Sequence, residues 1–249
     1  MTSTSTLPPL PPTKFGETLT HLEPRPPSAS LADIILGGQD GLVNTLGVIL
    51  GVAAASSDPR IVIAGGFAAT FAESISMGAV AYTSTLADHD HYRAELERER
   101  REIHEVPHVE EQEVRTIFTR WGFTDDLLER AVAQVIKNEE AWVEVMMRNE
   151  LKLAPIESTN ARRAALVVGF SAIVGSLIPL IPFLLLPLGA AVPVSLVVSA
   201  LALFGVGAYK ARITVGRPLH SGLQMALIGI ISALAGYFIG ALFGAQPGG

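Results

Sequence analysis

Long apolar stretches alternate with one highly charged segment along the chain, and this pattern predicts the fold. No Asp, Glu, Lys, Arg or His occurs between Ala164 and Tyr209, or from Ser221 to the C-terminus. A helix needs about 20 predominantly apolar residues to cross a bilayer. We therefore expect an all-α integral membrane protein with five transmembrane helices and a helical segment in water between the second and the third. The expected spans are 31–55, 61–86, a third that begins after Arg163 and ends near Pro179 or Pro182, a fourth that ends at Lys210, and 218–244.

Two connections follow from the positions of proline. The second span is expected to continue beyond the membrane as one long helix, because no helix breaker appears before Pro107. A short PFLLLPLG segment is expected to join the third and fourth spans.

The basic residues predict the orientation, because cytoplasmic loops are rich in Lys and Arg. On one side of the expected spans the only basic residue is Arg60. The N-terminus and the charged segment are therefore expected in the cytoplasm, and the C-terminus outside. The proline-rich N-terminus favours a bacterial inner (plasma) membrane over an organelle. The basic residues of the cytoplasmic side are Lys14, Arg25, Arg93, Arg98, Arg100, Arg101, Arg162, Arg163, Lys210, Arg212 and Arg217.

Composition excludes several classes of function. The chain has no cysteine, so disulfides, thiolate-bound zinc and iron–sulfur clusters are excluded. The formal net charge is −6, and between Tyr92 and Lys152 there are 15 acidic against 10 basic residues. This acidic segment lacks the basic footprint that nucleic-acid binding requires, so no nucleic-acid partner is expected. Cations are the expected partners.

The second span carries one formal charge, Glu73, and an ionisable residue inside a membrane is by default a functional-site hypothesis. Met77 lies one helical turn away on the same face. In the first span, Asp40 is expected about two turns inside the membrane, with Asn44 one turn further. Carboxylate oxygens beside a thioether indicate a transition-metal cation, and carboxylates that bind it must lose their protons. The alternative, which the residues leave open, is that these side chains only pair and pack with neighbouring helices.

The acidic segment carries candidate ligands in pairs on three expected helices. The members of each pair are three or four residues apart, so they lie on one helical face, and three such faces could enclose divalent cations. The alternative is that Arg98, Arg100 and Arg101 pair with these glutamates on a solvated face, and that Met146 is a core residue. The candidate ligands are Glu99, Glu102, Glu110, Glu113, Met146 and Glu150.

Two further motifs contain residue types that bind metal ions. The stretch HEVPH at His104–His108 matches the H-E-x-x-H pattern of zinc hydrolases, but that motif needs a continuous helix and Pro107 would break it. An enzyme is therefore not expected. Close to the second span, His89, Asp90 and His91 form a surface suited to collecting metal ions.

Glycines recur at intervals of four within the spans, which lets helices approach closely. The spacing leaves open whether these contacts lie within one chain or between two chains of a dimer. The glycines concerned are Gly37 and Gly41, Gly47 and Gly51, and Gly236, Gly240 and Gly244.

Four segments together resemble the vacuolar iron transporter family: DGLVNTLGVILGVA (40–53), FAESISMGAVAYTS (71–84), ELERERREIHEVP (95–107) and NEEAWVEVMMRNELKL (138–153). The resemblance implies a homodimer of five-span subunits that moves Fe²⁺, and often Mn²⁺, out of the cytosol in exchange for protons. It also implies that Asp40 and Met77, with Glu73 beside them, line the transport path, and that the six candidate ligands form a cytoplasmic metal-binding domain. One departure is Ala81, where members of the family often have an acidic residue.

The expected function is transport of Fe²⁺, and of Mn²⁺, out of the cytosol by proton exchange, with Fe²⁺, Mn²⁺ or Zn²⁺ bound at the cytoplasmic domain. The alternative is a membrane-anchored iron sensor or buffer that binds metal without transporting it. The expected domains are a disordered cytoplasmic tail at 1–30, the first two spans at 31–88, the acidic helical metal-binding domain at 89–158, and the last three spans at 159–245.

Overall fold

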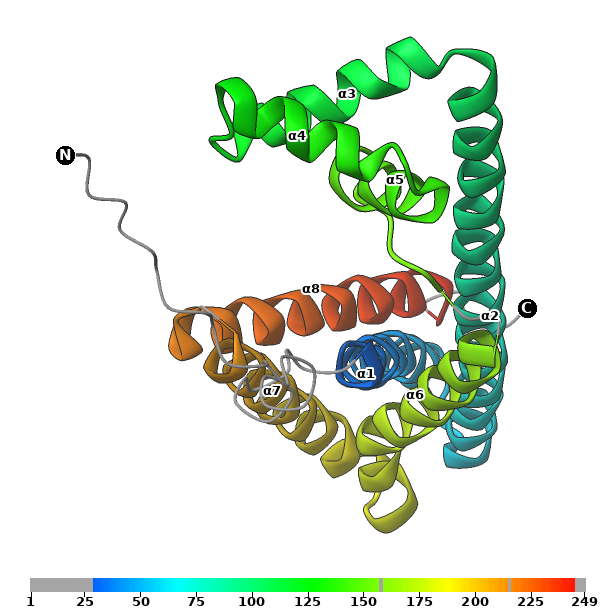
Figure 1. Ribbon diagram of the computed structural model, residues 1–249. Coiled ribbons are helices and arrows are strands. Elements are labelled where there is room, and N and C mark those ends of the chain that lie inside the picture. Colours follow the sequence, from blue (N-terminus) through cyan, green and yellow to red (C-terminus); the bar gives the residue numbers. More distant parts are fainter. Residues whose placement is uncertain (1–28, 157–158, 215, 245–249) are drawn as a thin grey trace, which may run out of the picture.

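The computed structural model describes residues 29–156, 159–214 and 216–244, and all regular elements in these ranges are helices (Figure 1). Five of them are long and apolar enough to cross a membrane, namely α1, α2, α6, α7 and α8, which confirms the all-α fold with five spans. The proline-rich tail expected at residues 1–30 lies almost wholly outside the described residues. The helices are α1 (Ala29–Ala55), α2 (Pro59–Glu105), α3 (Pro107–Arg120), α4 (Asp125–Val135), α5 (Glu139–Val145), the π-helical turn η2 (Met146–Glu150), α6 (Thr159–Leu185), α7 (Leu188–Ile213) and α8 (Pro218–Gly244).

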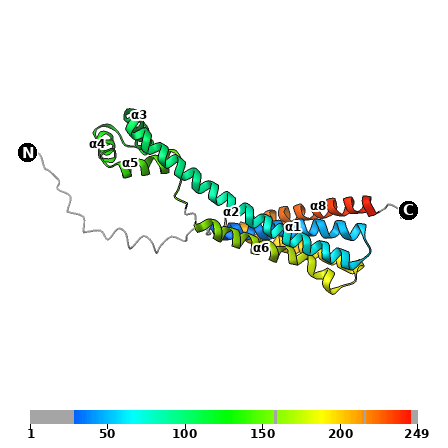
Figure 2. The ribbon, with the colours of Figure 1, turned by 90° about the vertical axis from the view of Figure 1, so that its right-hand side faces the viewer.

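Helix α2 is one continuous helix of 47 residues, as the absence of an early breaker predicted. Asp58 caps its start by accepting a hydrogen bond from the backbone N–H of Arg60 (2.9 Å), and the helix ends immediately before Pro107. At 1.5 Å per residue it is about 70 Å long, whereas the hydrocarbon core of a bilayer is about 30 Å thick. About half of α2 therefore extends beyond the membrane, toward the inserted helices α3–η2 (Figure 2).

The helices between α2 and α6, together with the last turns of α2, form a unit that we call the inserted subdomain (residues 95–150). It has an apolar core of its own, separate from the spans. Aromatic and aliphatic side chains from α2, α3, α4 and α5 meet there, which explains why four short helices pack into one unit. The buried core residues are Ile103, Val114, Ile117, Phe118, Val132, Trp142, Val143, Met146 and Met147.

The expected end of the third span near Pro179 or Pro182 is wrong. Helix α6 continues through both prolines to Leu185, and only a short turn separates it from α7. Proline is tolerated inside a membrane helix because neighbouring helices and hydroxyl side chains can satisfy the local backbone. In addition, the hydroxyl of Ser195 on α7 donates a hydrogen bond to the carbonyl oxygen of Pro179 (2.7 Å), and this bond holds α7 against the same part of α6.

Helix α1 is the centre of the bundle, with α2, α6, α7 and α8 arranged around it (Figure 1). Glycines allow its backbone to touch its neighbours. A Cβ atom on Gly37 or Gly41 would lie 2.3 Å from a carbonyl oxygen of α6. On α8, a Cβ atom on Gly236 or Gly240 would lie 2.1 or 1.9 Å from a carbonyl oxygen of α1. The regularly spaced glycines thus make contacts within the chain, which resolves the choice that their spacing left open.

Substitution of Gly240 tests this close packing. The Gly240→Ala substitution should lower the melting temperature of the detergent-solubilised protein by several degrees, because overpacking a tight contact costs about 1–3 kcal/mol. The matched control is Gly189→Ala, since a Cβ atom at Gly189 would meet no atom within 4 Å. Equal melting temperatures for the two variants would contradict the contact between α1 and α8.

Candidate functional site

Two carboxylates meet inside the membrane-spanning bundle. The side chain of Glu73 on α2 lies beside Asp40 and Asn44 of α1, close enough to interact with both. Asp40 and Glu73 are half-buried and Asn44 is exposed, so the pair is reached from the side of the bundle. Two adjacent carboxylates repel each other strongly in a medium of low dielectric constant, unless a proton or a cation lies between them. The structure therefore brings together the two intramembrane acids that the sequence singled out.

Packing of α2 against α6 determines where Glu73 points. The hydroxyl of Ser74 donates a hydrogen bond to the carbonyl oxygen of Gly169 (2.8 Å), and Gly78 faces the backbone of α6 at Ala165. Because these small residues of α2 pack against α6, the neighbouring face of α2, which carries Glu73, points toward α1. Met77 is one turn further along that face and is half-buried.

A second acidic group lies in the inserted subdomain. Glu99 of α2 and Glu110 of α3 are only 2% and 3% exposed, and one oxygen of each carboxyl has no hydrogen-bond partner among the described residues. The carboxyls of Glu102, Glu113 and Glu150 are their electrostatic neighbours. Five of the six candidate ligands, from three segments of the chain, thus lie within electrostatic range of one another. The sixth, Met146, is fully buried in the apolar core.

Arginine neutralises only part of this acidic group. Arg98 contacts three carboxylates, with N–O distances of 2.8 Å to Glu95, 3.7 Å to Glu99 and 3.6 Å to Glu102. Arg100 and Arg101 are exposed and form no ion pair with the described residues. The alternative that arginines neutralise these glutamates on a solvated face therefore applies to Arg98 alone.

Burial and mutual repulsion change the acidity of this group. Burial, and then the charge of Glu113, raise the pKa of the Glu110 carboxyl to about 7. The same two causes raise the pKa of Glu150 to about 7. Glu150 is exposed as a residue, so solvent screens its carboxyl more than that of Glu110. Burial also raises the pKa of Glu99, and the neighbouring Arg98 opposes this effect. The carboxyls of Glu110 and Glu150 therefore exchange protons close to neutral pH.

The remaining sequence candidates are placed as follows. His104 belongs to α2 and Pro107 begins α3, so HEVPH crosses a helix boundary and does not form the continuous helix of zinc hydrolases. His89 lies 3.1 Å from the carboxylate of Asp90, and His91 lies 4.0 Å from Glu95. Within the described parts of the chain, no three His, Asp or Glu side chains are close enough to form a preformed metal centre.

One feature of the site had no signal in the sequence. Residues Met146–Glu150 form a π-helical turn, in which the backbone N–H of Leu151 donates to the carbonyl of Met146 (3.2 Å). Such single π turns occur often at functional sites, and this one places Glu150 beside Glu113. A π turn and an α turn need no different residue types, so the sequence could not reveal it.

A bundle of five apolar helices with paired carboxylates inside it defines a polytopic membrane protein of the transporter type. The chain belongs to the VIT family, whose sequence profile matches residues 31–241. It is 34% identical to vacuolar iron transporter 1 of Tulipa gesneriana, over 82% of this chain and 83% of the relative. It is 35% identical to vacuolar iron transporter 1 of Arabidopsis thaliana, over 82% of each chain, and 26% identical to protein CCC1 of Saccharomyces cerevisiae, over 86% of this chain and 69% of the relative.

These relatives confirm the resemblance and correct one expectation. Members of the family are transporters, which confirms that the chain is not an enzyme. The expected bacterial inner membrane is wrong, because the similar proteins come from plants and yeast and the plant proteins are named for the vacuole. That expectation relied on the proline-rich N-terminus, and a proline-rich segment has no physical property that selects one membrane over another.

The raised pKa of Glu110 predicts how the stability of the subdomain depends on pH. The folded protein keeps the proton of the Glu110 carboxyl up to about pH 7, whereas the unfolded chain releases it near the ordinary pKa of 4.5. The free energy of unfolding should therefore fall as the pH rises between these two values. The part of this fall that Glu110 contributes should be at most about 3 kcal/mol. Thermal unfolding in detergent without divalent cations measures it.

Two variants sharpen this measurement. Glu110→Gln should reduce the pH dependence, while Glu97→Gln, at an exposed carboxylate of α2, should leave it unchanged. A flat profile for the unmodified protein would contradict the raised pKa.

Proposed function

We propose that this protein transports Fe²⁺, and also Mn²⁺, out of the cytosol in exchange for protons. The observation that carries the proposal is the contact between Asp40 of α1 and Glu73 of α2 inside the membrane-spanning bundle. The similar proteins named vacuolar iron transporter support iron as the transported ion and a vacuolar membrane as the location.

The physical basis of exchange is the cost of charge in a membrane. An uncompensated carboxylate is expensive there, so Asp40 and Glu73 need either protons or a cation. A divalent cation that binds between them displaces the protons, because metal ligands must be deprotonated, and protons that arrive from the other side release the cation. The thioether of Met77, one turn from Glu73, favours a transition metal over Mg²⁺ or Ca²⁺.

The inserted subdomain supplies the metal in this mechanism. Its group of five carboxylates, around Glu99 and Glu110, collects divalent cations on the cytosolic side, which is the side that the basic residues of the short loops predict for it. It is joined to the spans by the continuous helix α2, which also carries Glu73. The protein thus offers a binding site in water and a second one in the membrane, connected by one rigid element.

A second copy of the chain completes the site in the membrane. Asn44 is exposed and Asp40 and Glu73 are half-buried at the side of a single bundle, where lipid would leave them without polar partners. The faces of α1 that carry glycines already pack against α6 and α8 of the same chain. The dimer contact that we propose therefore involves the polar face of α1 and α2. A homodimer about this face encloses the carboxylates and gives the transported ion a polar path.

Substitutions in the membrane test the transport path. In vesicles with an imposed pH gradient, Asp40→Asn and Met77→Ala should each reduce Fe²⁺ flux to the leak of protein-free vesicles, since each removes a proposed ligand. Size-exclusion chromatography should show unchanged assembly. The control is Asp88→Asn, which neutralises an exposed carboxylate of the same α2. Normal flux in both path variants would refute the site.

Substitutions in the subdomain test its role as a collector. Replacing Glu102 and Glu113 by Gln should raise the Fe²⁺ concentration for half-maximal flux by about tenfold and leave the maximal rate unchanged. Both side chains are only half-buried, so the apolar core is left intact. The control replaces Glu97 and Glu140, two exposed carboxylates of the same segment, by Gln. A reduced maximal rate with an unchanged half-saturation would contradict a collecting role.

The alternative of a membrane-anchored sensor or buffer predicts stoichiometric metal binding without flux. The family membership does not favour it, and no contact in the structure requires it. The flux assay separates the two functions directly, because a sensor would give no flux above the leak in the unmodified protein.

A further inference from the structure

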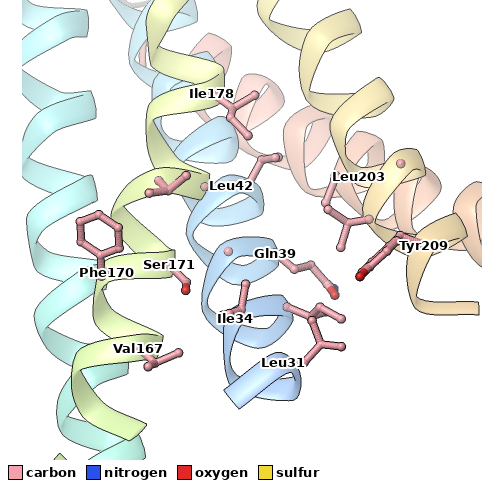
Figure 3. Close-up of a pocket in the computed structure, with 16 residues that line it drawn as sticks. Leu31, Ile34, Gln39, Leu42, Val167, Phe170, Ser171, Ile178, Leu203 and Tyr209 are labelled. Atoms are coloured by element: carbon pink, nitrogen blue, oxygen red, sulfur yellow. The ribbon is translucent and has the colours of Figure 1, made fainter. Parts of the chain in front are cut away.

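A cavity of about 630 Å³ opens between α1, α6 and α7, in the half of the bundle where α1 begins (Figure 3). Its volume is in the range of small-molecule sites. Ile34 and Leu42 of α1 are among its apolar lining residues, and the polar side chains in its lining are Gln39, Ser171 and Tyr209 (Figure 3). Neither carboxylate of the transport path lines it. The cavity is therefore a separate feature of the bundle.

The dimensions of the cavity match one leaflet of a bilayer. Its wall on α6 runs from Val167 to Ile178, which at 1.5 Å per residue is about 16 Å. One leaflet contributes about 15 Å of hydrocarbon. Phe170 and Val174 on this wall are 69% and 50% exposed, so the cavity is open to the surrounding lipid. An extended acyl chain therefore fits it in length and in polarity.

Two cations lie just beyond the end of this cavity. Arg163 precedes Val167 by four residues and Lys210 follows Val206 by four, so each lies one turn from the lining on the same face of its helix. Both are exposed, and among the described residues neither takes part in an ion pair. Because α6 begins and α7 ends at the same side of the bundle, the two cations share one membrane surface. Basic sites between transmembrane helices recognise anionic lipid headgroups.

We propose that this cavity binds one anionic phospholipid from the cytosolic leaflet, with an acyl chain inside and the phosphate group at Arg163 and Lys210. The amide of Gln39 and the hydroxyl of Tyr209, which point into the gap between α1 and α7 in Figure 3, donate hydrogen bonds to its ester and phosphate oxygens. A phospholipid combines an apolar chain of this length with an anionic end. It therefore matches both the lining and the charges better than a protein helix does.

The headgroup is tested by competition between lipids. The protein is reconstituted in nanodiscs with equal amounts of palmitoyl-oleoyl phosphatidylglycerol and phosphatidylcholine, and the lipids retained in mild detergent are counted by native mass spectrometry. We expect one phosphatidylglycerol per chain in preference to phosphatidylcholine. Arg163→Gln and Lys210→Gln should each reduce this preference about fivefold. Arg217→Gln, which removes an equal charge on the same side but away from the cavity, should leave it unchanged.

The acyl chain is tested by filling the cavity. Gly205 lines it, and a Cβ atom there would meet no atom within 4 Å, so the side chain of Gly205→Leu starts in open space and reduces the volume of the cavity. It should abolish retention of the lipid while the melting temperature of the lipid-free protein stays unchanged. Gly189→Leu, at an equally open position of the same helix outside the cavity, is the control.

Several results would overturn the proposal. Equal retention of the two lipids by the unmodified protein, or normal retention by Gly205→Leu, would show that the cavity is not the site. Displacement of phosphatidylglycerol by millimolar inorganic phosphate would assign the cations to a free anion. A Gly205→Leu variant with an altered oligomeric state and unchanged lipid retention would assign the cavity to a second copy of the chain.

Discussion

Close backbone contact along α1 is the constraint on which the rest of the bundle depends. Gly37 and Gly41 bring α1 against α6, and its contacts with Gly236 and Gly240 bring it against α8. With two sides of α1 occupied in this way, the face that carries Asp40 is left for α2, which delivers Glu73. The pairing of two acids inside the membrane is thus a consequence of how closely two helices can approach each other at glycine residues, which have no side chain.

The two acidic groups of the protein lie in different surroundings and have different properties for that reason. The pair in the spans lies between α1 and α2 at the side of an apolar bundle, where a charge without a partner is expensive. The group in the subdomain lies at the edge of an apolar core and in reach of water, where burial and repulsion bring the pKa of Glu110 to about 7. On the proposed function, the first group couples metal to protons and the second collects metal at neutral pH.

Most of the fold could be predicted from patterns that depend on one helix at a time. The stretches without charged residues predicted the spans, and the lack of a helix breaker predicted the full length of α2 as far as Pro107. The error at Pro179 came from the same local reasoning, because a neighbouring helix supports that turn through Ser195. Residue spacing likewise put Glu99, Glu102, Glu110 and Glu113 on helical faces, but it could not show that these faces converge.

The sequence by itself determined the class of the protein and its chemically unusual residues, because hydropathy, charge and helical period are properties of a single segment. It therefore identified the five spans, the acids within them and the acidic subdomain. Only the tertiary structure decided which residues meet. It placed Glu73 beside Asp40 and put Met146 in the apolar core. It also placed the regularly spaced glycines at contacts between helices of the same chain, and it left a cavity between α6 and α7. Contacts between segments distant in sequence depend on the packing of all helices together, and no local pattern contains that information.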